Sequence, residues 1–337
     1  MTTIVIDKNI PFIGDSLDSV ANVVALPAEE ITPQAVADAD ALLVRTYTRC
    51  DAALLGNSKV RFVGTGTIGT DHLDLAWMAA NGITAVNAPG CNAPAVAQYV
   101  LASILTLFPD PEGLTVGIVG VGNVGSIVER WCRQLGMHTL MCDPPKAAGN
   151  TAGNYVTLSQ IASQSDIITF HTPHTREPHP WPTYHLADSR FFNSLQRKPV
   201  IINSARGPVT DTEALLQALD NGQVSQAVID CWEGEPANIS TALARKAAIA
   251  TPHIAGYSIE GKKRATQTIV NALLAHLGSD RRIDLGVSQG AATDVTKESI
   301  LASYDPMADT RYLLDGLETG RPFAWLRNNY TLRHETR

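Results

Sequence analysis

Three ionisable residues in the second half of the chain have the types that acid–base chemistry needs. Arg206 lies in INSARGPVTD, Glu235 in DCWEGEP and His253 in TPHIAGY. A guanidinium can hold a carboxylate, an imidazole can move a proton near neutral pH, and a carboxylate can tune that imidazole. Taken singly, each residue also fits a structural role, because salt bridges, solvated acids and loop histidines are common. Together they supply what hydride transfer to a 2-oxo acid requires.

Each of these residues follows a short apolar run that we expect to form a β-strand. Many such runs are continuously apolar, as strands buried on both faces of a parallel sheet must be. Amphipathic stretches between them, such as 123–136 and 211–219, suit the crossover helices of βαβ units. Open sheets of this kind bind ligands beyond the carboxyl ends of their strands. The runs lie at 3–7, 39–46, 60–67, 82–89, 114–120, 138–145, 165–173, 199–207, 226–232 and 247–256.

The stretch TVGIVGVGNVGSIVERWCRQLGMHTLMCDPP predicts a dinucleotide site. It places Gly120, Gly122 and Gly125 of a G-x-G-x-x-G motif between an apolar strand and a helix, and Asp143 follows the next strand. The motif alone is a weak indication, because glycine-rich turns also occur without a ligand, but its context here is the expected one. The glycines would admit a pyrophosphate at the helix N-terminus. Asp143 would accept from ribose hydroxyls and favour NAD over NADP, although nearby Lys146 leaves room for NADP.

The alternation of runs and helices predicts an α/β protein with two Rossmann-like, doubly wound parallel-sheet domains and a small C-terminal region. We expect residues 1–95 with 257–277 to form a substrate-binding domain. Residues 96–256 would form the NAD-binding Rossmann domain. The charged and irregular sequence of 278–337 would be a short appended region that resembles a dimerisation domain.

Three local features add detail to this division. The segment 87–108 is expected to contain a long buried helix that joins the two domains. The segment 259–277 is expected to be a helix that packs back against the first domain. Thr210 and Glu213 have the spacing of a capping box, which predicts that a helix starts there.

The bulk composition is that of a globular protein. The 337 residues are 45% hydrophobic and 18% charged, with a net charge of −7 and no basic run, which argues against nucleic-acid binding. The most apolar run, 95–108, is too short to span a bilayer, and the sequence begins with no basic and apolar leader. Five scattered cysteines without a C-x-x-C pair are typical of reduced thiols, so we expect a soluble cytoplasmic protein.

The sequence resembles the D-isomer-specific 2-hydroxyacid dehydrogenases. The glycine motif, ARGPVTD, DCWEGEP and PHIAG occur in the order and spacing seen in that family, over about residues 1–277. Further pieces are most similar to members that oxidise a phosphorylated four-carbon 2-hydroxy acid in vitamin B6 biosynthesis. These pieces are VGTGTIGTDHLDLAW, APGCNAPAVAQYV, LMCDPP, DIITFHTP, YHLAD and ATPHIAGYSIEGK. The resemblance implies an NAD-dependent oxidoreductase, a small phosphorylated 2-hydroxy acid substrate and a homodimer.

The resemblance also implies roles for single residues. Arg206 and Glu235 would be active-site residues, and His253 would be the proton donor. Substrate contacts are implied at Thr46, Thr67 and Tyr257. The NAD site would be lined by Gly120, Gly122, Asn123, Val124, Gly125, Asp143, Thr172, Ser204, Ala205, Arg206, Asp230 and Gly256.

Two other functions stay open at this point. The chain could be a dehydrogenase for 3-phosphoglycerate or another 2-hydroxy acid, or a corepressor-like module that senses NAD with the same fold and triad. Tyr257, whose hydroxyl we expect to donate to the substrate phosphate, argues against the first, and the lack of a recognisable peptide-docking insert argues against the second.

Family members of this type carry a longer final domain that helps to form the dimer. This sequence stops short of its last portion, which leaves the dimer geometry open.

A group of histidines in one loop raises the question of a metal site. The residues are His171, His174, His179 and His185. They follow a strand in a proline-rich loop, and no cysteine or acid completes a ligand set. We therefore predict no metal, and we expect Thr172 in the same run to meet the nicotinamide ribose.

Overall fold

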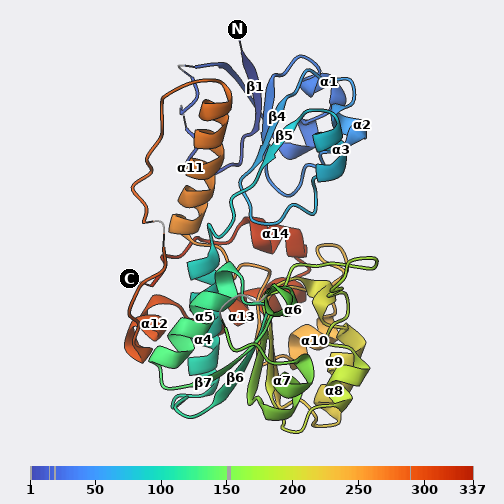
Figure 1. The fold of residues 1–337 in the computed structure, drawn as a ribbon, viewed down its shortest axis with the longest axis vertical. Coiled ribbons are helices and arrows are strands. Elements are labelled where there is room, and N and C mark those ends of the chain that lie inside the picture. Colours follow the sequence, from blue (N-terminus) through green and yellow to red (C-terminus); the bar gives the residue numbers. More distant parts are fainter. Residues whose placement is uncertain (1, 15, 19, 150–152, 289, 337) are drawn as a thin grey trace. The chain divides into compact units, whose positions relative to one another are not determined.

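The chain folds into two compact units, each built on a parallel β-sheet with helices on its faces (Figure 1). The computed structural model describes residues 2–14, 16–18, 20–149, 153–288 and 290–336. The first unit comprises Met1–Asn92 and Ser258–Gly290, and the second comprises Ala93–Tyr257 and Ala291–Arg337. The predicted fold class, α/β with two Rossmann-like doubly wound parallel sheets, is confirmed.

The first unit has a five-stranded sheet in the order β2-β1-β3-β4-β5, the order of flavodoxin-like sheets. Its central strands are almost wholly buried because helices cover both faces. The sequence pattern did not predict β2, an edge strand whose residues are only half-buried or exposed. The strands are β1 Thr3–Asp7, β2 Asn22–Leu26, β3 Ala41–Val44, β4 Phe62–Thr65 and β5 Thr84–Val86.

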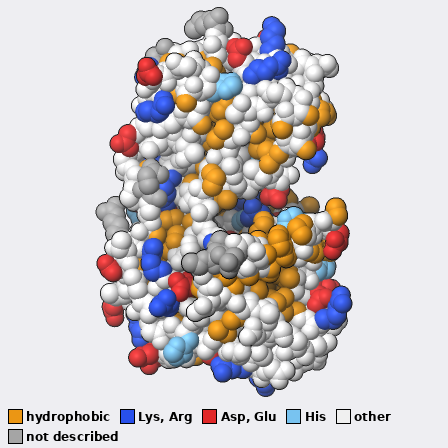
Figure 2. Space-filling view, viewed as in Figure 1, with side chains coloured by type: hydrophobic (Ala, Val, Ile, Leu, Met, Phe, Trp, Pro, Cys, Tyr) orange, Lys and Arg blue, Asp and Glu red, His pale blue; other side chains and the backbone are white. Residues whose placement is uncertain are grey.

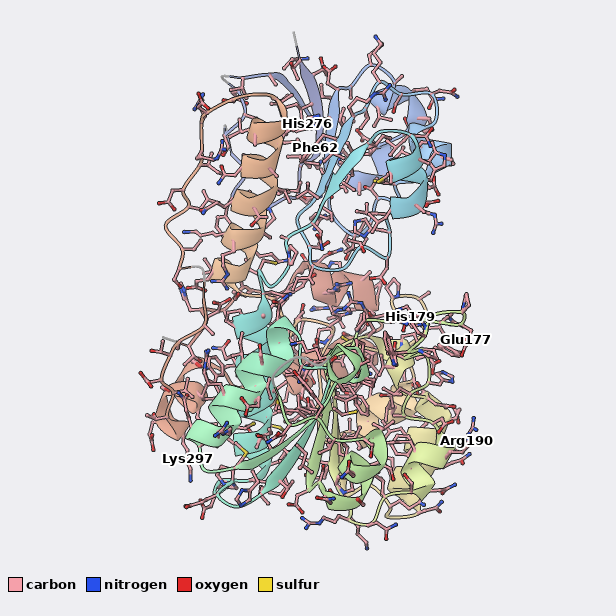
Figure 3. The ribbon with its side chains drawn as sticks, in the orientation of Figure 1. Phe62, Glu177, His179, Arg190, His276 and Lys297 are labelled. Atoms are coloured by element: carbon pink, nitrogen blue, oxygen red, sulfur yellow. The ribbon has the colours of Figure 1, made fainter. Side chains whose placement is uncertain are left out.

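Helix α11, Ile259–His276, covers one face of this sheet, and three short helices cover the other (Figure 1). Ser258 caps α11 by accepting from Gly261 N at 2.9 Å. The ring of His276 lies 5.1 Å from that of Phe62 on β4 (Figure 3). The predicted packing of this helix on the first unit is therefore confirmed. The other helices are α1 Pro33–Val36, α2 Ala52–Leu55 and α3 Leu75–Ala80, and Ala28–Glu30 form a 3-10 turn η1.

The second unit has a six-stranded sheet in the order β11-β10-β9-β8-β6-β7. From β6 the chain moves outward to β7 and to a single bridge between Met141 and Tyr155, and then returns to β8 on the other side of β6. This reversal creates a topological switch point, where the carboxyl ends of β6 and β8 leave room for a ligand. The strands are β6 Thr115–Val119, β7 His138–Cys142, β8 Ile167–Phe170, β9 Val200–Asn203, β10 Gln226–Ile229 and β11 Ile249–Ala250.

Helices cover both faces of the second sheet and bury an apolar core on each. One face carries α4 Ala93–Leu107, α5 Asn123–Gln134 and α12 Lys297–Ser303. The other carries α7 Leu158–Gln164, α8 Ser189–Asn193, α9 Thr212–Asp220, α10 Thr241–Lys246, α13 Pro306–Glu318 and α14 Phe323–Asn328. The two remaining short elements are α6 Pro144–Ala148 and the 3-10 turn η2 Gly207–Val209. The long buried helix expected near residue 100 is α4, which lies wholly in the second unit.

The C-terminal residues differ from the expected irregular appendage. Residues 278–290 belong to the first unit, and residues 291–337 belong to the second, where they form three helices. Ile300 of α12 and Leu313 of α13 are fully buried in the two cores of that unit. Helices α12 and α14 have only seven and six residues, and α13, with 13 residues, fully buries a single large apolar side chain, Leu313. None of them shows a clear apolar stripe, which is why the pattern did not indicate them.

The predicted capping box at the start of α9 is wrong by one residue. The N-cap is Asp211, whose Oδ1 accepts from Ala214 N at 3.0 Å. Thr210 is buried instead, and its hydroxyl accepts from Asn203 Nδ2 at 3.3 Å. The acid outcompetes the threonine because it stands directly before the helix and its side chain is not engaged by Asn203.

The described helices include none that is both long and apolar enough to cross a bilayer. On the face shown in Figure 2, Lys and Arg side chains alternate with Asp and Glu on each unit and do not gather into one basic patch. This distribution agrees with the net charge of −7.

Candidate active site

His253 lies in a tight turn directly after β11. Its backbone φ of 58° falls in the left-handed region that favours glycine. Such a conformation costs on the order of 1–3 kcal/mol and persists where the surroundings hold it firmly. The contacts around this turn must therefore hold the backbone of His253 in this conformation.

Asp230, at the end of β10, holds the N–H side of this turn. Its Oδ1 accepts from Thr251 Oγ1 at 2.6 Å and from Ile254 N at 2.7 Å, and its Oδ2 accepts from Ala255 N at 3.0 Å. The side chain is fully buried, and burial raises the pKa of Asp230 despite these hydrogen bonds and the nearby charge of His253. Asp230 therefore acts on His253 by fixing its loop, and its predicted place in the NAD site stays a prediction.

Arg333, from the C-terminal segment, holds the C=O side of the same turn. Its guanidinium donates to Ile254 O at 3.0 Å, to Tyr257 O at 3.3 Å and to Ala255 O. It also donates to Ala95 O at 3.1 Å, which ties the turn to the start of α4. The backbone N–H groups of the turn are therefore bound by a carboxylate, and its backbone carbonyl groups are bound by a guanidinium. No sequence pattern indicated this role, because Arg333 is a single arginine in a stretch without a motif.

Glu235 and His253 form the pair that the sequence predicted. His253 Nδ1 donates to Glu235 Oε1, and the two side chains are 22% and 19% exposed. Glu235 Oε2 accepts from Trp232 N at 3.2 Å, which fixes the carboxylate. Burial opposes ionisation, but the charge and hydrogen bond of His253, with the charge of Arg327, outweigh it and lower the pKa of Glu235. This arrangement leaves Nε2 of His253 to exchange a proton with a substrate.

Asn203 organises the turn that carries Arg206 at the end of β9. Its Nδ2 donates to Arg206 O at 3.0 Å and to Thr210 Oγ1 at 3.3 Å, and its Oδ1 accepts from Ala205 N at 3.1 Å. The Arg206 guanidinium donates to Ala205 O at 2.8 Å and is half-buried. We did not single out Asn203 from the sequence. Its position as the last residue of an apolar strand was the available signal.

The turn of Arg206 packs against the loop that follows β10. A Cβ built on Gly207 would overlap Trp232 O, so only glycine permits this approach. Cys231 Sγ donates to Ala205 O at 3.4 Å across the same contact. The structure therefore brings the Arg206 turn to the loop that carries Glu235.

The three glycines of the motif have three different environments. Gly120 has a φ of 88°, and a Cβ there would lie 2.8 Å from His171 O. A Cβ on Gly125 would overlap Gly120 O, so this glycine lets α5 pack onto the strand. Around Gly122, by contrast, no described residue other than its chain neighbours lies within 4 Å of a built Cβ. This open space at the N-terminus of α5 fits a pyrophosphate.

Two buried hydroxyls near this loop lack a partner within the part of the chain that the structure describes. They are Thr172 Oγ1, which follows β8, and Ser204 Oγ, which follows β9. Buried polar atoms of this kind are normally satisfied, so these two indicate a missing hydrogen-bonding group. Both residues were predicted to line the NAD site. Their hydroxyls therefore fit a dinucleotide bound at the carboxyl ends of β8 and β9.

Asp143 lies at the end of β7 beside the glycine loop. Its Oδ2 accepts from Val121 N at 2.8 Å, and its Oδ1 accepts from Lys146 N at 3.1 Å. Lys146 Nζ donates to Val121 O at 2.6 Å. The structure therefore places the predicted ribose-binding carboxylate next to the loop, with an ammonium group close to it.

The other predicted residues fall in both units. Thr46 and Thr67 follow the neighbouring strands β3 and β4 of the first unit, and Thr67 Oγ1 donates to Gly69 O at 3.0 Å. Tyr257 closes the His253 turn, where its N–H donates to Ile254 O at 2.8 Å. Asn123 and Val124 begin α5, Ala205 precedes Arg206, and Gly256 precedes Tyr257.

The loop histidines take part in other contacts. His185 Nε2 pairs with Glu233 Oε1 at 2.6 Å, while His179 is exposed in a loop beside Glu177 (Figure 3). Burial lowers the pKa of His171 to about 3, which keeps it neutral. Among the described residues, no three or more His, Cys, Asp or Glu side chains form a group that could hold a metal ion.

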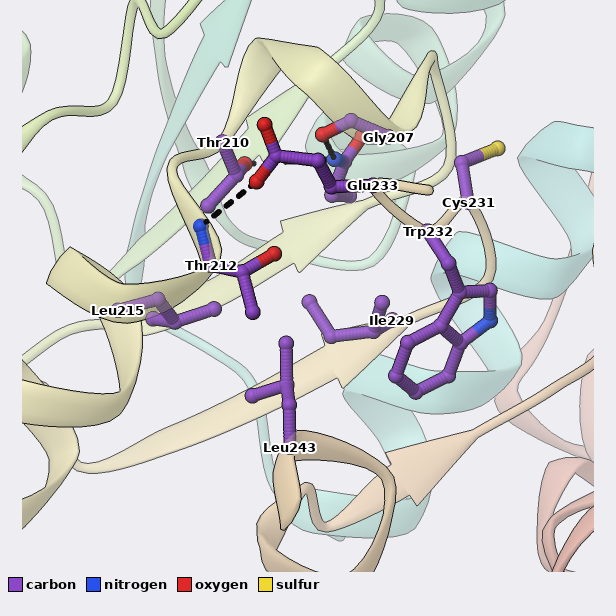
Figure 4. Close-up of a pocket in the computed structure, with 10 residues that line it drawn as sticks. Gly207, Thr210, Thr212, Leu215, Ile229, Cys231, Trp232, Glu233 and Leu243 are labelled. Carbon is purple, nitrogen blue, oxygen red and sulfur yellow. Dashed lines mark hydrogen bonds between the residues drawn. The ribbon is translucent and has the colours of Figure 1, made fainter. Parts of the chain in front are cut away.

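A small cavity lies behind the Arg206 turn (Figure 4). Its volume is about 10 Å³, room for about one water molecule. Glu233 borders it and accepts from Thr212 N at 3.2 Å. The cavity is too small for a dinucleotide or a sugar phosphate, so it belongs to the packing behind the site. Its other lining residues are Asn203, Gly207, Thr210, Leu215, Ile229, Cys231, Trp232 and Leu243.

Comparison with known proteins relates this arrangement to a family. Residues 104–255 match the family described as D-isomer specific 2-hydroxyacid dehydrogenase, NAD binding domain. A protein of Bacteroides fragilis named erythronate-4-phosphate dehydrogenase is 44% identical over 344 residues, which cover 98% of this chain and 97% of that protein. The chain belongs to the erythronate-4-phosphate dehydrogenase family. The family resemblance predicted from the sequence is thereby confirmed.

Other members of the family, and more distant relatives, extend this result. The erythronate-4-phosphate dehydrogenase of Escherichia coli is 43% identical over 287 residues, which cover 84% of this chain and 75% of that protein. The D-lactate dehydrogenase of Aquifex aeolicus, solved with NAD and lactic acid, superposes with a TM-score of 0.68 at 23% identity and covers 82% of this chain and 96% of its own. That likeness shows the shared fold. The predicted cofactor is also confirmed, because the matched domain binds NAD, and the chain is an NAD-dependent oxidoreductase.

Proposed function

We propose that this protein oxidises 4-phospho-D-erythronate to 2-oxo-3-hydroxy-4-phosphobutanoate, with NAD as the oxidant, in the biosynthesis of pyridoxal 5′-phosphate (vitamin B6). The observation that carries the proposal is the Glu235–His253 pair, held against the Arg206 turn in a chain of this family. The substrate is a phosphorylated hydroxy acid, as the name of the family states.

The chemical roles follow from the geometry of the pair. NAD, when bound, accepts the hydride from C2 of the substrate. His253 Nε2 takes the proton of the C2 hydroxyl, so the two hydrogens lost from the alcohol are both accounted for. Glu235 stabilises the imidazolium that forms and keeps the ring oriented through Nδ1. Arg206 holds the substrate carboxylate and the developing carbonyl through its planar guanidinium.

The residues around the dinucleotide would hold it by three kinds of contact. The first-turn N–H groups of α5 bind the pyrophosphate, because Gly122, the N-cap, has no side chain to cover them. The hydroxyls of Thr172 and Ser204 donate to the bound cofactor, and Asp143 accepts from the adenosine ribose. Asn123, Val124, Ala205, Asp230 and Gly256 complete the site that we propose.

A panel of 2-hydroxy acids tests the proposed substrate. The purified protein is given NAD and, in separate assays, 4-phosphoerythronate, 3-phosphoglycerate and D-lactate, and NADH formation is followed. We expect the highest kcat/KM with 4-phosphoerythronate. A higher kcat/KM with 3-phosphoglycerate or D-lactate would reassign the substrate, and a lack of turnover with every acid would favour a binding module.

Replacing Glu235 tests the pairing through the pH dependence of oxidation. The lowered pKa of Glu235 keeps it a carboxylate above its ordinary value of 4.5, so it stabilises protonated His253 throughout the working range. In Glu235→Gln the imidazolium that forms during oxidation loses the carboxylate that stabilises it. We therefore expect the rising limb of kcat/KM against pH to lie at lower pH than in the unmodified protein.

The matched control for this measurement is Glu233→Gln. Glu233 lies two residues away and pairs with His185 instead of the catalytic histidine. Its replacement should leave the position of the limb unchanged. An unshifted profile in Glu235→Gln would refute the pairing.

Replacing Asp143 tests the choice of cofactor. We expect the unmodified protein to prefer NAD over NADP by a wide margin, because a 2′-phosphate would lie against the carboxylate. Asp143→Ala should narrow the ratio of kcat/KM for NAD and NADP by roughly tenfold or more, which corresponds to ~1.4 kcal/mol. Steady-state kinetics with both cofactors measure this ratio, and equal use of the two by the unmodified protein would overturn the assignment.

The proposal extends to assembly, location and the first unit. We propose that the protein is a homodimer in the cytoplasm and that Thr46 and Thr67 contact the substrate. The five cysteines are buried and form no disulfide among the residues that the structure describes, which suits a reducing compartment. Light scattering on the purified protein measures the assembly, and a monomeric mass would contradict the dimer.

A further inference from the structure

The second unit fixes the end of α14 close to the His253 turn. Phe323 and Leu326 of α14 are buried in its core, and Tyr312 of α13 donates its hydroxyl to Leu326 O at 2.9 Å. A Cβ built on Gly316 would overlap the Leu326 side chain, so α13 and α14 are in close contact. The next residue after Leu326 is Arg327, and its backbone is held by this packing.

Arg327 faces Tyr257, the last residue of the turn. Its Cζ lies 5.8 Å from the centre of the Tyr257 ring, within the range of a cation–π contact. Tyr330, which follows Arg327 closely in the sequence, also lies beside Tyr257, with 6.2 Å between the two ring centres. Arg327 and Tyr257 are both half-buried, so each keeps an accessible part.

The same guanidinium acts on the catalytic carboxylate. Its charge contributes to the lowered pKa of Glu235, after the larger influence of His253, and it also acts on Cys231. Arg327 therefore lies beside Tyr257, four residues after His253, and its charge also acts on Glu235. Neither the sequence patterns nor the family motifs singled out this residue.

We propose that Arg327 and Tyr257 together bind the phosphate group of the substrate. The inference rests on the proposed function, in which the substrate carries a carboxylate and a phosphate. Arg206 is assigned to the carboxylate, and the phosphate adds a charge of about −1.5 to −2 at neutral pH. A guanidinium presents several N–H donors in one plane, which match phosphate oxygens. The Tyr257 hydroxyl supplies a further donor to the same group.

Kinetics with and without the phosphate test the proposal. Arg327→Gln, Tyr257→Phe and the double variant are compared using 4-phosphoerythronate and D-erythronate. Each single variant should lose roughly 10- to 100-fold in kcat/KM for the phosphorylated acid, as expected for a hydrogen bond to a charged group. Each should lose far less for D-erythronate. The double variant should lose less than the product of the two single losses, because the residues share one ligand.

Arg321→Gln is the matched control. Arg321 is exposed, lies over the Trp325 ring and comes just before α14, on the N-terminal side of Arg327. Its replacement should leave both substrates unaffected. Equal losses for both substrates in Arg327→Gln would overturn the phosphate assignment.

A binding measurement separates this proposal from the proposed function. Inorganic phosphate is titrated into the NAD-bound protein, and the Tm is followed. We expect phosphate to raise the Tm of the unmodified and Arg321→Gln proteins and to have little effect on Arg327→Gln. This result would support the phosphate site even if the protein did not oxidise 4-phosphoerythronate. An equal rise in Arg327→Gln would overturn it.

Discussion

His253→Ala is expected to lose turnover by at least ~10²-fold while it still binds NAD, which is the usual scale for one general acid–base group. The imidazole is the group that Glu235, Asp230 and Arg333 all help to place. Its removal takes away the proton acceptor and leaves the glycine loop intact. Alanine also adopts the left-handed backbone of this position at some cost, so the free energy of unfolding must be measured with the rate.

The control for this variant is His179→Ala. His179 is exposed in its loop and has no proposed role. Its replacement should change neither kcat nor NAD affinity. Retention of more than about a tenth of the unmodified kcat in folded His253→Ala would contradict the assigned role, because a general base typically contributes more than that.

Gly122→Ala and Gly125→Ala are expected to fail in different ways. Beyond its chain neighbours, no described residue lies within 4 Å of a Cβ on Gly122, so Gly122→Ala should fold and lose at most about 1 kcal/mol in the free energy of unfolding, because alanine is a poorer N-cap than glycine. The new methyl group would occupy the space of the pyrophosphate. We expect NAD affinity to fall by roughly 100-fold, the effect of losing about two hydrogen bonds to a charged group.

In Gly125→Ala, by contrast, the new Cβ would overlap Gly120 O. The helix must then shift, and we expect a loss of ~1–3 kcal/mol in the free energy of unfolding, as for other overpacked sites. Chemical denaturation and calorimetric NAD titration of both variants measure the two effects. Normal NAD affinity in Gly122→Ala would show that the pyrophosphate does not bind in the space beside Gly122.

Most of the fold could be predicted because its strands are short, apolar and separated by recognisable helices. The strand β2 and the helices α12 to α14 could not be predicted, and one physical reason applies to all four elements. This edge strand and these helices bury few large apolar side chains, so their sequences carry little periodicity. Their positions depend on tertiary contacts, such as the packing of Ile300 and Leu313 into the cores of the second unit.

The candidate site was predictable where a motif carries its own chemistry. Glu235 and His253 meet as expected, and the glycines have the environments that a dinucleotide needs. The residues that position the site were not predictable. Arg333 is far from the His253 turn in sequence, and no local pattern reveals that its guanidinium holds three carbonyls of that turn.

Asp230 and Arg327 also make long-range contacts that no local sequence pattern reveals. The family resemblance implies a place for Asp230 at the NAD site, which stays a prediction, but it did not indicate that this carboxylate also holds the His253 turn. Arg327 comes to Tyr257 through the packing of α14. Long-range contacts of this kind depend on the completed fold, which a single sequence does not display.

The most direct measurement of the central claim uses 4-phosphoerythronate with deuterium at C2. The purified protein is supplied with this substrate and NAD, and the resulting NADH and the solvent water are analysed for deuterium. We predict that the deuterium is found in NADH and that kcat/KM is lower than with the unlabelled substrate. Recovery of the deuterium in water, or unlabelled NADH, would contradict oxidation at C2 by this protein.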